Sequence, residues 1–431
     1  MKRDFTAIVL AAGKGKRMRS RHPKVLHRLA GKPLIYYVLR ELMGMRRYIK
    51  QIVVVVGHKN KNVEEAARKY FSHSRKKLDF VYQNQPLGTA DAVRCAQQKV
   101  KCDDILIMCA DTPLITRTTL RSFISFFLRK RAACALITAY RSDKNDLGSV
   151  LRDSKGRPCA VKEKLDFNPQ GILAEVNSGI YCFKRDALLQ SIKKIEKNAR
   201  KQEYFLTDAI QILSGAGCRI EAYLLDDSEQ ILGINTQHHL RRAEKALRRK
   251  ICDQFIARGV NIIDPESTFI EEGAKIGKNT YIYPFTFIEK NVIIGSNCTL
   301  GPFIHVREGC RIKDNAYLGN FVEICRSKIG KGVRMKHLGY LGDTSVGDNV
   351  NIGAGTVVAN FDGKKKHKTF IEEDSFIGCD TILIAPLKVG KGAFTGAGSV
   401  VTRDVGAYTV VAGVPARILK SAQKYTSKTK R

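Results

Sequence analysis

An aliphatic residue recurs at every sixth position from residue 270 to residue 324, and this period constrains the fold more than any other feature of the chain. A period of six fits neither an α-helix nor an ordinary β-strand, which repeat at about 3.6 and 2 residues. It is the signature of a parallel β-helix, in which each hexapeptide forms a short strand and a turn. We expect the recurring residues to point inward and to stack from coil to coil: Ile270, Ile276, Ile282, Ile288, Ile294, Leu300, Val306, Ile312, Leu318 and Ile324.

The period continues to residue 401 with two slips of one residue and one polar insertion, Ala359 to Lys368. The expected inward positions are then Ile329, Met335, Leu341, Val346, Ile352, Val358, Ile371, Ile377, Leu383, Val389, Thr395 and Val401. Glycines and asparagines between the first hexads suit turns that need a positive φ. These are Gly277, Asn279, Gly295, Asn297 and Gly301.

The length and composition limit the number of domains and the classes of partner that we expect for this chain. A chain of 431 residues is long enough for two or three domains, and an apolar fraction of 44% is ordinary for a globular protein. The net charge of +34 favours polyanions, anionic lipid or anionic substrates as partners, but the basic residues are spread along the whole chain, so we interpret most of them as a solvated surface. The twelve cysteines show no zinc-binding spacing, which indicates free thiols in a reducing cytoplasm, and no apolar run is long enough for a transmembrane segment.

Before the β-helix, short apolar strands alternate with helical segments. We expect strands at 5–10, 52–56, 80–82, 105–109 and 133–140, and helices at 34–43, 63–70, 90–97 and 118–130. This alternation predicts an α/β, Rossmann-like domain with a mostly parallel sheet that is covered on both faces. Ligands of such sheets bind at the carboxyl ends of the strands.

A glycine-rich turn directly follows the first strand. The string Ala11-Ala12-Gly13-Lys14-Gly15-Lys16-Arg17-Met18 combines glycines, which let backbone N–H groups approach phosphate oxygens, with basic side chains. It is neither a Walker loop nor the dinucleotide fingerprint. Together with the segment Pro23-Lys24-Val25-Leu26, it resembles the signature of the sugar-nucleotidyltransferases, in which a sugar 1-phosphate attacks a nucleoside triphosphate.

This resemblance implies a set of nucleotide- and sugar-binding residues. They are Leu10, Ala11, Ala12, Gly13, Lys24, Gln83, Gly88, Thr89, Asp111, Gly148, Glu163, Asn177 and Asn235. Asp111 and Asn235 match the two Mg²⁺ ligands of the family, and the stretch Glu203 to Asp208 is a further family landmark. One carboxylate and one amide suit Mg²⁺, which prefers hard oxygen ligands and few protein side chains. Arg17 and Lys24 are expected to hold the triphosphate and the charge that develops on it.

The two halves together resemble the GlmU-type family of bifunctional enzymes. That family transfers an acetyl group from acetyl-CoA to glucosamine 1-phosphate in a left-handed β-helix, and it then couples the product to UTP. The resemblance implies a uridylyltransferase domain over residues 1–236, a linker helix over 237–259, an acetyltransferase β-helix over 260–418 and a basic tail over 419–431. It also implies homotrimers, with each acetyltransfer site at a subunit boundary, and it implies no specific nucleic-acid partner.

The motif from Arg334 to Asp343 matches the family's histidine motif, which makes His337 the expected general base. A base is needed because the sugar ammonium must lose a proton before its nitrogen attacks the thioester, and histidine titrates in the right range. The resemblance also implies binding residues for glucosamine phosphate, which are Arg307, Tyr340, Asn351 and Lys366. For acetyl-CoA it implies Ala354, Asn360, Phe361, Cys379 and Ala397.

One departure bears directly on the acetyltransferase. Cys325 stands where the family has a second phosphate-binding lysine, and Arg326 follows it. Neighbouring side chains of a strand point to opposite faces, so the pattern leaves open whether Arg326 substitutes for that lysine. Two alternatives to the bifunctional enzyme therefore stay open. One is a nucleotidyltransferase whose β-helix serves only for trimerisation or regulation, and the other is a basic module that binds nucleic acid or anionic membranes.

Overall fold

The computed structural model describes residues 4–13, 15–20, 22–57, 61–72, 74, 78–141, 147–163, 173–200 and 202–421. The chain divides into two compact units, residues 1–244 and 245–431. The division falls within α7 (Gln237–Ile256), the helix expected to link two domains. Most of the expected basic tail, from residue 422 on, lies outside the described residues, as does Lys14 of the glycine-rich turn.

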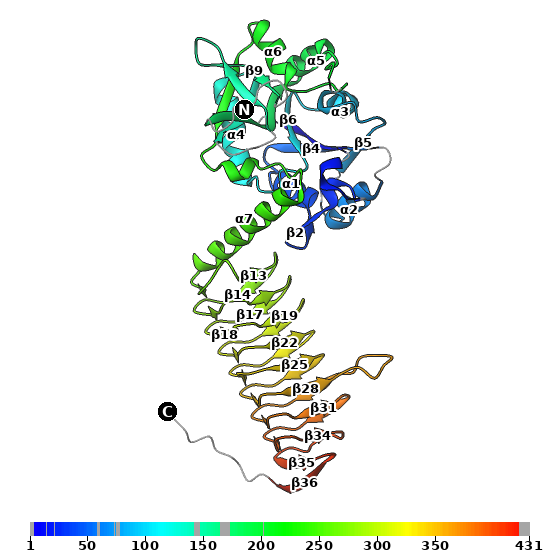
Figure 1. Ribbon diagram of the computed structural model, residues 1–431, viewed down its shortest axis with the longest axis vertical. Coiled ribbons are helices and arrows are strands. Elements are labelled where there is room, and N and C mark those ends of the chain that lie inside the picture. Colours follow the sequence, from blue (N-terminus) through cyan, green and yellow to red (C-terminus); the bar gives the residue numbers. More distant parts are fainter. Residues whose placement is uncertain are drawn as a thin grey trace. The chain divides into compact units, whose positions relative to one another are not determined.

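The first unit is built on a mixed sheet (Figure 1). Its strands follow the order β11 (Ile220–Leu224), β7 (Cys134–Arg141), β10 (Ala174–Lys184), β6 (Asp104–Cys109), β1 (Phe5–Ala11), β4 (Ile49–Gly57) and β5 (Leu78–Gln83). Along this path β10 runs antiparallel to both of its neighbours, and the other pairs are parallel. A hairpin of β8 (Ser149–Arg152) and β9 (Pro158–Lys162) joins the sheet through β10. The expected mostly parallel sheet is confirmed.

Helices cover both faces of this sheet because successive strand residues point in opposite directions. Ala7 and Val9 pack in one core with α1 (Leu34–Met43), α2 (Lys61–Phe71) and α4 (Arg117–Lys130). Ile8 packs in a second core with α3 (Thr89–Ala96), α5 (Arg185–Lys194) and α6 (Asp208–Gly215). The shorter elements are η1 (Lys16–Met18), η2 (Lys24–Leu26), η3 (Gln97–Lys99), η4 (Ser228–Ile231), β2 (Arg28–Leu29) and β3 (Lys32–Pro33).

Residues 261–421, all of them described, form three sheets that make up a parallel β-helix, except that the last strand, β36, pairs antiparallel with β35 (Figure 1). The first sheet contains β12 (Asn261–Ile262), β15 (Tyr281–Ile282), β18 (Thr299–Leu300), β21 (Tyr317–Leu318), β24 (Arg334–Met335), β27 (Asn351–Ile352), β30 (Phe376–Ile377), β33 (Phe394–Thr395), β35 (Thr409–Gly413) and β36 (Ala416–Ser421). The second contains β13 (Phe269–Ile270), β16 (Phe287–Ile288), β19 (His305–Val306), β22 (Val322–Cys325), β25 (Gly339–Gly342), β28 (Thr356–Ala359), β31 (Ile382–Ile384) and β34 (Val400–Val401). The third contains β14 (Lys275–Ile276), β17 (Ile293–Ile294), β20 (Arg311–Ile312), β23 (Lys328–Ile329), β26 (Thr344–Val346), β29 (Thr369–Ile371) and β32 (Leu387–Val389).

The stacking of the coils follows the hexapeptide period and its slips. Strands on successive coils pair 18 residues apart at first, as Ile282 pairs with Leu300, and 17 residues apart after the first slip, as Leu318 pairs with Met335. The polar insertion lengthens one coil, so Ile352 pairs with Ile377. The expected inward residues are buried, except that Ile276 is half-buried near the first coil.

Positive φ angles confirm the turn prediction for Asn279, Asn297 and Gly301, but the prediction was wrong for Gly277 and Gly295. These two glycines are needed for close approach instead. A Cβ atom on Gly277 would lie 2.6 Å from the carbonyl carbon of Gly295 on the next coil, and a Cβ on Gly295 would lie 2.6 Å from the backbone nitrogen of Asp314. Stacked turns therefore exclude side chains at this position.

Two neighbouring isoleucines of β17 test whether the inward stack stabilises the β-helix. Ile294 is 3% exposed and lies in the core, whereas Ile293 is 38% exposed on the outer face. We expect Ile294→Ala to lower the free energy of unfolding of the β-helix by about 2–5 kcal/mol because it leaves a cavity. Ile293→Ala is the matched control and should change it by less than about 0.5 kcal/mol. Denaturant titration followed by circular dichroism measures both, and equal effects would contradict the inward stack.

Candidate active sites

The glycine-rich turn leaves the carboxyl end of β1 beside the carboxyl end of β6. Leu10 pairs with Cys109 in register, and the Ala110 N–H donates to the Leu10 carbonyl at 3.0 Å. Ala11 and Ala12 are buried at this end, and Gly13 is exposed. The expected phosphate-binding turn and the expected metal-binding Asp111 therefore start from adjacent strand ends.

Lys24, Asp111 and Asn235 converge in the first unit although they are far apart in the sequence. The Lys24 ammonium forms an ion pair with Asp111 and donates to Asn235 Oδ1 at 2.9 Å. The Lys24 and Asp111 side chains are each 14% exposed. The Ile234 N–H donates to the Asp111 carbonyl at 2.9 Å, which ties the two segments together. The two oxygens thus already hold one cation between them, and hard oxygens from a carboxylate and an amide are also the donors that Mg²⁺ prefers.

Gly15 and Arg17 lie on the connection between β1 and Lys24. Gly15 has φ +61°, and a Cβ atom on it would lie 2.7 Å from the Lys24 Cβ, so a glycine lets the turn approach the lysine. Arg17 is exposed on η1. The connection therefore carries one half-buried cation, Lys24, and one exposed cation, Arg17.

The segment from Gln83 to Ala90, which the family resemblance predicts to read the base, packs against the stretch Glu203 to Asp208, which contains Tyr204. The Tyr204 N–H donates to the Leu87 carbonyl at 2.7 Å, and the Leu206 N–H donates to Thr89 Oγ1 at 2.9 Å. Gln83 is buried, and its Nε2 donates to the Gly88 carbonyl at 3.1 Å and to Asp91 at 2.7 Å. These contacts hold together two segments whose contact with each other could not be predicted from the sequence.

Gly148, Glu163 and Asn177, which the family resemblance predicts to contact the sugar, are held by internal hydrogen bonds. The Asn177 N–H donates to the Gly148 carbonyl at 2.9 Å, and its side-chain amide donates to the Tyr181 hydroxyl at 2.6 Å. Glu163 accepts a hydrogen bond from the Thr207 hydroxyl at 3.0 Å. Burial raises the pKa of Tyr181, so this hydroxyl stays neutral. Tyr181 was not identified from the sequence, and Thr207 was identified only as part of the stretch Glu203 to Asp208.

In the β-helix, one column of turns carries the expected general base and three of the expected acetyl-CoA residues. His337, Ala354, Cys379 and Ala397 each lie two residues after a strand of the first sheet, on four successive coils. Backbone hydrogen bonds connect these turns, from Asp380 to the Ala354 carbonyl at 2.7 Å and from Gly398 to the Cys379 carbonyl at 2.8 Å. Adjacent coils are about 4.8 Å apart. The exposed His337 has no hydrogen-bond partner among the described residues, which leaves its imidazole available for proton transfer.

The expected phosphate-binding residues lie on two faces of the β-helix. Arg307 follows β19 and forms an ion pair with Glu323, whose neighbour on the next coil is Tyr340. Asn351 belongs to the first sheet, where it pairs with Arg334 and Phe376. One chain therefore gathers Arg307 and Tyr340 on the face of the second sheet and does not bring Asn351 to them.

The polar insertion projects from the stacked coils as a closed loop (Figure 1). Phe361 pairs with Lys366 across the loop, and Asp362 accepts hydrogen bonds from the backbone of Lys364 and Lys365 at 2.7 Å each. The hydrogen bond that Asp362 accepts from His367 Nε2 at 2.6 Å contributes most to lowering the pKa of Asp362. The expected ligands Phe361 and Lys366 are exposed on this loop, at a place where they can reach beyond their own chain.

Asn360 begins the loop and is buried. Its amide donates to Asp343 at 2.5 Å, and it also lies against the Tyr340 hydroxyl. Asp343 was not among the residues expected from the sequence, yet it connects the loop to the second sheet. The hydrogen bond from Arg326 is the largest of the effects that lower the pKa of Asp343, so its carboxylate is ionised at neutral pH.

Other features of the described residues bear on function. All twelve cysteines are free thiols. Within the described ranges, no group of three or more His, Cys, Asp or Glu side chains is arranged to hold a metal. None of the helices described has the length and the apolar character needed to cross a bilayer.

Comparison with known families covers both units. Residues 6–229 match the family of nucleotidyl transferases. Residues 267–303 and 291–326 match the bacterial transferase hexapeptide, and residues 368–403 match the hexapeptide repeat of succinyl-transferase. Fold, site and family matches together define a nucleotidyltransferase joined to a hexapeptide-repeat transferase.

Three relatives carry the name bifunctional protein GlmU. The relative from Caldicellulosiruptor saccharolyticus is 36% identical over 441 residues, which cover 94% of this chain and 94% of the relative. Those from Thermodesulfovibrio yellowstonii and Heliobacterium modesticaldum are each 38% identical, covering 92% and 93% of this chain and 94% and 93% of the relatives. The chain belongs to the GlmU family of bifunctional proteins.

Two glycines with positive φ test the contact between the base-reading segment and Tyr204. Gly88 has φ +107° and ψ −179°, and a Cβ on it would lie 2.4 Å from the Tyr204 carbonyl oxygen. Gly156 has φ +72° in an exposed turn, with nothing within 4 Å of a Cβ. Gly88→Ala meets both backbone strain of about 1–3 kcal/mol and a clash, whereas Gly156→Ala meets strain alone. Calorimetry should show the larger fall in melting temperature for Gly88→Ala, and equal falls would contradict this contact.

Proposed function

We propose that the chain makes UDP-N-acetylglucosamine in two successive reactions. The β-helix transfers the acetyl group of acetyl-CoA to the amine of glucosamine 1-phosphate. The first unit then couples N-acetylglucosamine 1-phosphate to UTP and releases pyrophosphate. The strongest support for this proposal is that the chain has both expected clusters and that bifunctional relatives match nearly its whole length. One unit has Lys24, Asp111 and Asn235 together, and the other has the column of turns that contains His337.

In the first unit, an oxygen of the sugar phosphate attacks the α-phosphorus of UTP, and the bond to the β-phosphate breaks. Such a reaction depends on positioning and on neutralising charge. Lys24 and Arg17 bind the triphosphate, and Gln83, whose amide N–H bonds are engaged by Gly88 and Asp91, presents its carbonyl oxygen to an N–H of the base. Mg²⁺ bound to Asp111 and Asn235 would neutralise part of the triphosphate charge. Asn177, Glu163 and Gly148 form the sugar subsite.

In the β-helix, the substrate amine is protonated in water and must lose a proton to become a nucleophile. The His337 imidazole accepts that proton, the nitrogen attacks the thioester carbonyl, and the carbon–sulfur bond breaks. The imidazolium returns its proton to the leaving CoA thiolate, and the nitrogen loses its second proton to solvent as the amide forms. Arg307, Tyr340 and Lys366 bind the sugar phosphate. Ala354, Asn360, Phe361, Cys379 and Ala397 bind acetyl-CoA.

The assembly we propose is a homotrimer whose acetyltransfer sites lie between neighbouring chains. Asn351 lies on a different face from Arg307 and Tyr340, and Lys366 is exposed on a projecting loop. A second copy of the chain could supply the missing residues to each site. We place both reactions in the cytoplasm. The alternative with a merely structural β-helix is disfavoured, because the bifunctional relatives match both units.

Two variants in opposite units separate the two activities. We expect His337→Ala to reduce sugar-dependent release of CoA thiol by about 10²–10⁴-fold, the usual contribution of a general base, and to leave unchanged the release of pyrophosphate from UTP and N-acetylglucosamine 1-phosphate. Asp111→Asn should do the reverse, because it removes a negative ligand from the first unit alone. Asp153→Asn, in an exposed turn of the first unit, is the matched control and should leave both activities intact. Loss of both activities in either variant, or of neither, would count against two independent sites.

A further inference from the structure

Cys325 and Arg326 lie next to Arg307 on the outer face of the second sheet. Val306, Ile324 and Leu341 point into the core on three successive coils, so the residues that follow them point outward. Arg307 and Cys325 are thus neighbours, and the Arg307 N–H donates to the Ile324 carbonyl at 2.8 Å. The Cys325 side chain is short and buried, so it cannot itself present a charge to a ligand.

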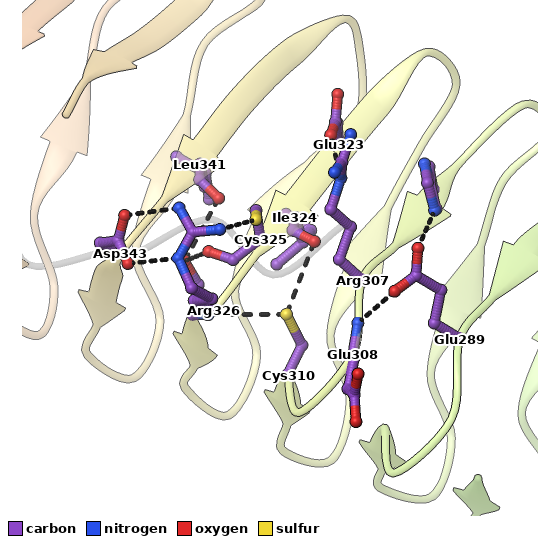
Figure 2. A network of polar contacts seen from close by, with 12 residues as sticks. Glu289, Arg307, Glu308, Cys310, Glu323, Ile324, Cys325, Arg326, Leu341 and Asp343 are labelled. Carbon is purple, nitrogen blue, oxygen red and sulfur yellow. Dashed lines mark hydrogen bonds and ion pairs between the residues drawn. The ribbon is translucent and has the colours of Figure 1, made fainter. Parts of the chain in front are cut away.

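The Arg326 side chain returns to the face on which Cys325 lies (Figure 2). In a regular strand it would point to the opposite face, but Arg326 is a turn residue with φ +50°. This left-handed conformation ends the alternation of the strand. The guanidinium consequently lies over Cys325, and its Nη1 donates to the Cys325 sulfur at 2.7 Å.

Asp343 holds the guanidinium in this place. Arg326 Nε donates to Asp343 Oδ1 at 2.6 Å, and Nη2 donates to Oδ2 at 2.7 Å, which is the two-pronged geometry that orients an arginine. The same carboxylate accepts from Asn360, which lies against the Tyr340 hydroxyl. Hydrogen bonding to Asp343 raises the pKa of Arg326, so the group keeps its positive charge. Arg326 is therefore a fixed cation among residues expected to bind the sugar phosphate and acetyl-CoA.

Arg326 keeps hydrogen-bonding capacity for a ligand. A guanidinium has five N–H bonds, and Cys325 and Asp343 engage three of them. The other two, one each on Nη1 and Nη2, have no partner among the described residues. The Arg326 side chain is 41% exposed, so a small anion can reach it from solvent.

We propose that Arg326 and Arg307 together bind the phosphate group of the amino-sugar phosphate, and that the small Cys325 makes room for the guanidinium of Arg326. This inference rests on the acetyl transfer proposed above. A phosphate monoester carries a charge of about −1.5 to −2 at neutral pH, so it can interact with both guanidinium groups at once. Each guanidinium is held in place by a carboxylate, Arg307 by Glu323 and Arg326 by Asp343. The planar guanidinium also presents its N–H bonds in a fixed fork that matches phosphate oxygens, whereas a lysine ammonium acts as a point charge.

Steady-state kinetics of Arg326→Ala test this assignment. We expect the KM for glucosamine 1-phosphate to rise about tenfold to a hundredfold, the usual effect of losing a charge-assisted contact. The KM for acetyl-CoA and the uridylyl transfer of the same preparation should not change. Acetyl transfer to glucosamine, which lacks the phosphate, should also be unaffected, whereas a merely structural role would lower it equally. Arg311→Ala, an exposed arginine on the third sheet, is the matched control and should leave all these values unchanged.

A second substitution tests the link between the two neighbours. Cys325→Lys, made in the Arg326→Ala background, should restore most of the affinity for glucosamine 1-phosphate, because the lysine reaches the space that the guanidinium has vacated. Arg326→Gln, which removes the charge and keeps hydrogen bonding to Asp343, should resemble Arg326→Ala in KM and serves if the alanine variant does not fold.

The outcomes separate the inference from the function on which it rests. Acetyl transfer in the unaltered protein with an unchanged KM in the Arg326 variants would overturn the role of Arg326 and leave the proposed function intact. Equal losses with glucosamine and with glucosamine 1-phosphate would also overturn that role. Absence of sugar-dependent CoA release from the unaltered protein would overturn both.

Discussion

The stacking of one aliphatic side chain on the next along the inside of the β-helix is the constraint from which the rest of that unit follows. Each coil contributes side chains such as Ile282, Leu300 and Leu318 to one continuous core. Because the inward residues lie in register, the turns between them form columns as well. The stacking of the core therefore also aligns turn residues that are not part of the core. It places His337 in one column with Ala354, Cys379 and Ala397.

In the first unit, interactions between charged and polar side chains at one edge of the sheet have the corresponding role. Parallel strands end at the same edge of the sheet, and this edge brings Asp111 close to the turn that carries Lys24. The oxygens of Asp111 and Asn235 then hold the lysine ammonium between them. A similar arrangement occurs in the β-helix, where Asp343 orients Arg326 and Glu323 opposes Arg307. In both units a carboxylate holds the cation that is proposed to meet a phosphate.

Much of this arrangement could be predicted from the sequence, and what escaped prediction has a common cause. The hexapeptide period located the core, the slips and the projecting insertion, and the alternation of strands and helices located the edge at which Asp111 lies. Side-chain direction at turns was not predictable, because it depends on local φ angles. For that reason the strand pattern did not decide the direction of the Arg326 side chain. Gly277 and Gly295 were predicted to have a positive φ, whereas the close stacking of the turns is what requires a glycine at these two positions. Contacts between distant segments, such as Gly88 with Tyr204, have no local signal at all.

A single assay tests whether one chain carries out the two reactions in a fixed order. Pyrophosphate release is measured with UTP and glucosamine 1-phosphate, with and without acetyl-CoA, on the same preparation. We expect release to require acetyl-CoA and to follow the release of CoA thiol, because the first unit uses the acetylated sugar. Release at the same rate without acetyl-CoA would contradict that order. Failure to release pyrophosphate even from N-acetylglucosamine 1-phosphate would contradict the proposed uridylyl transfer itself.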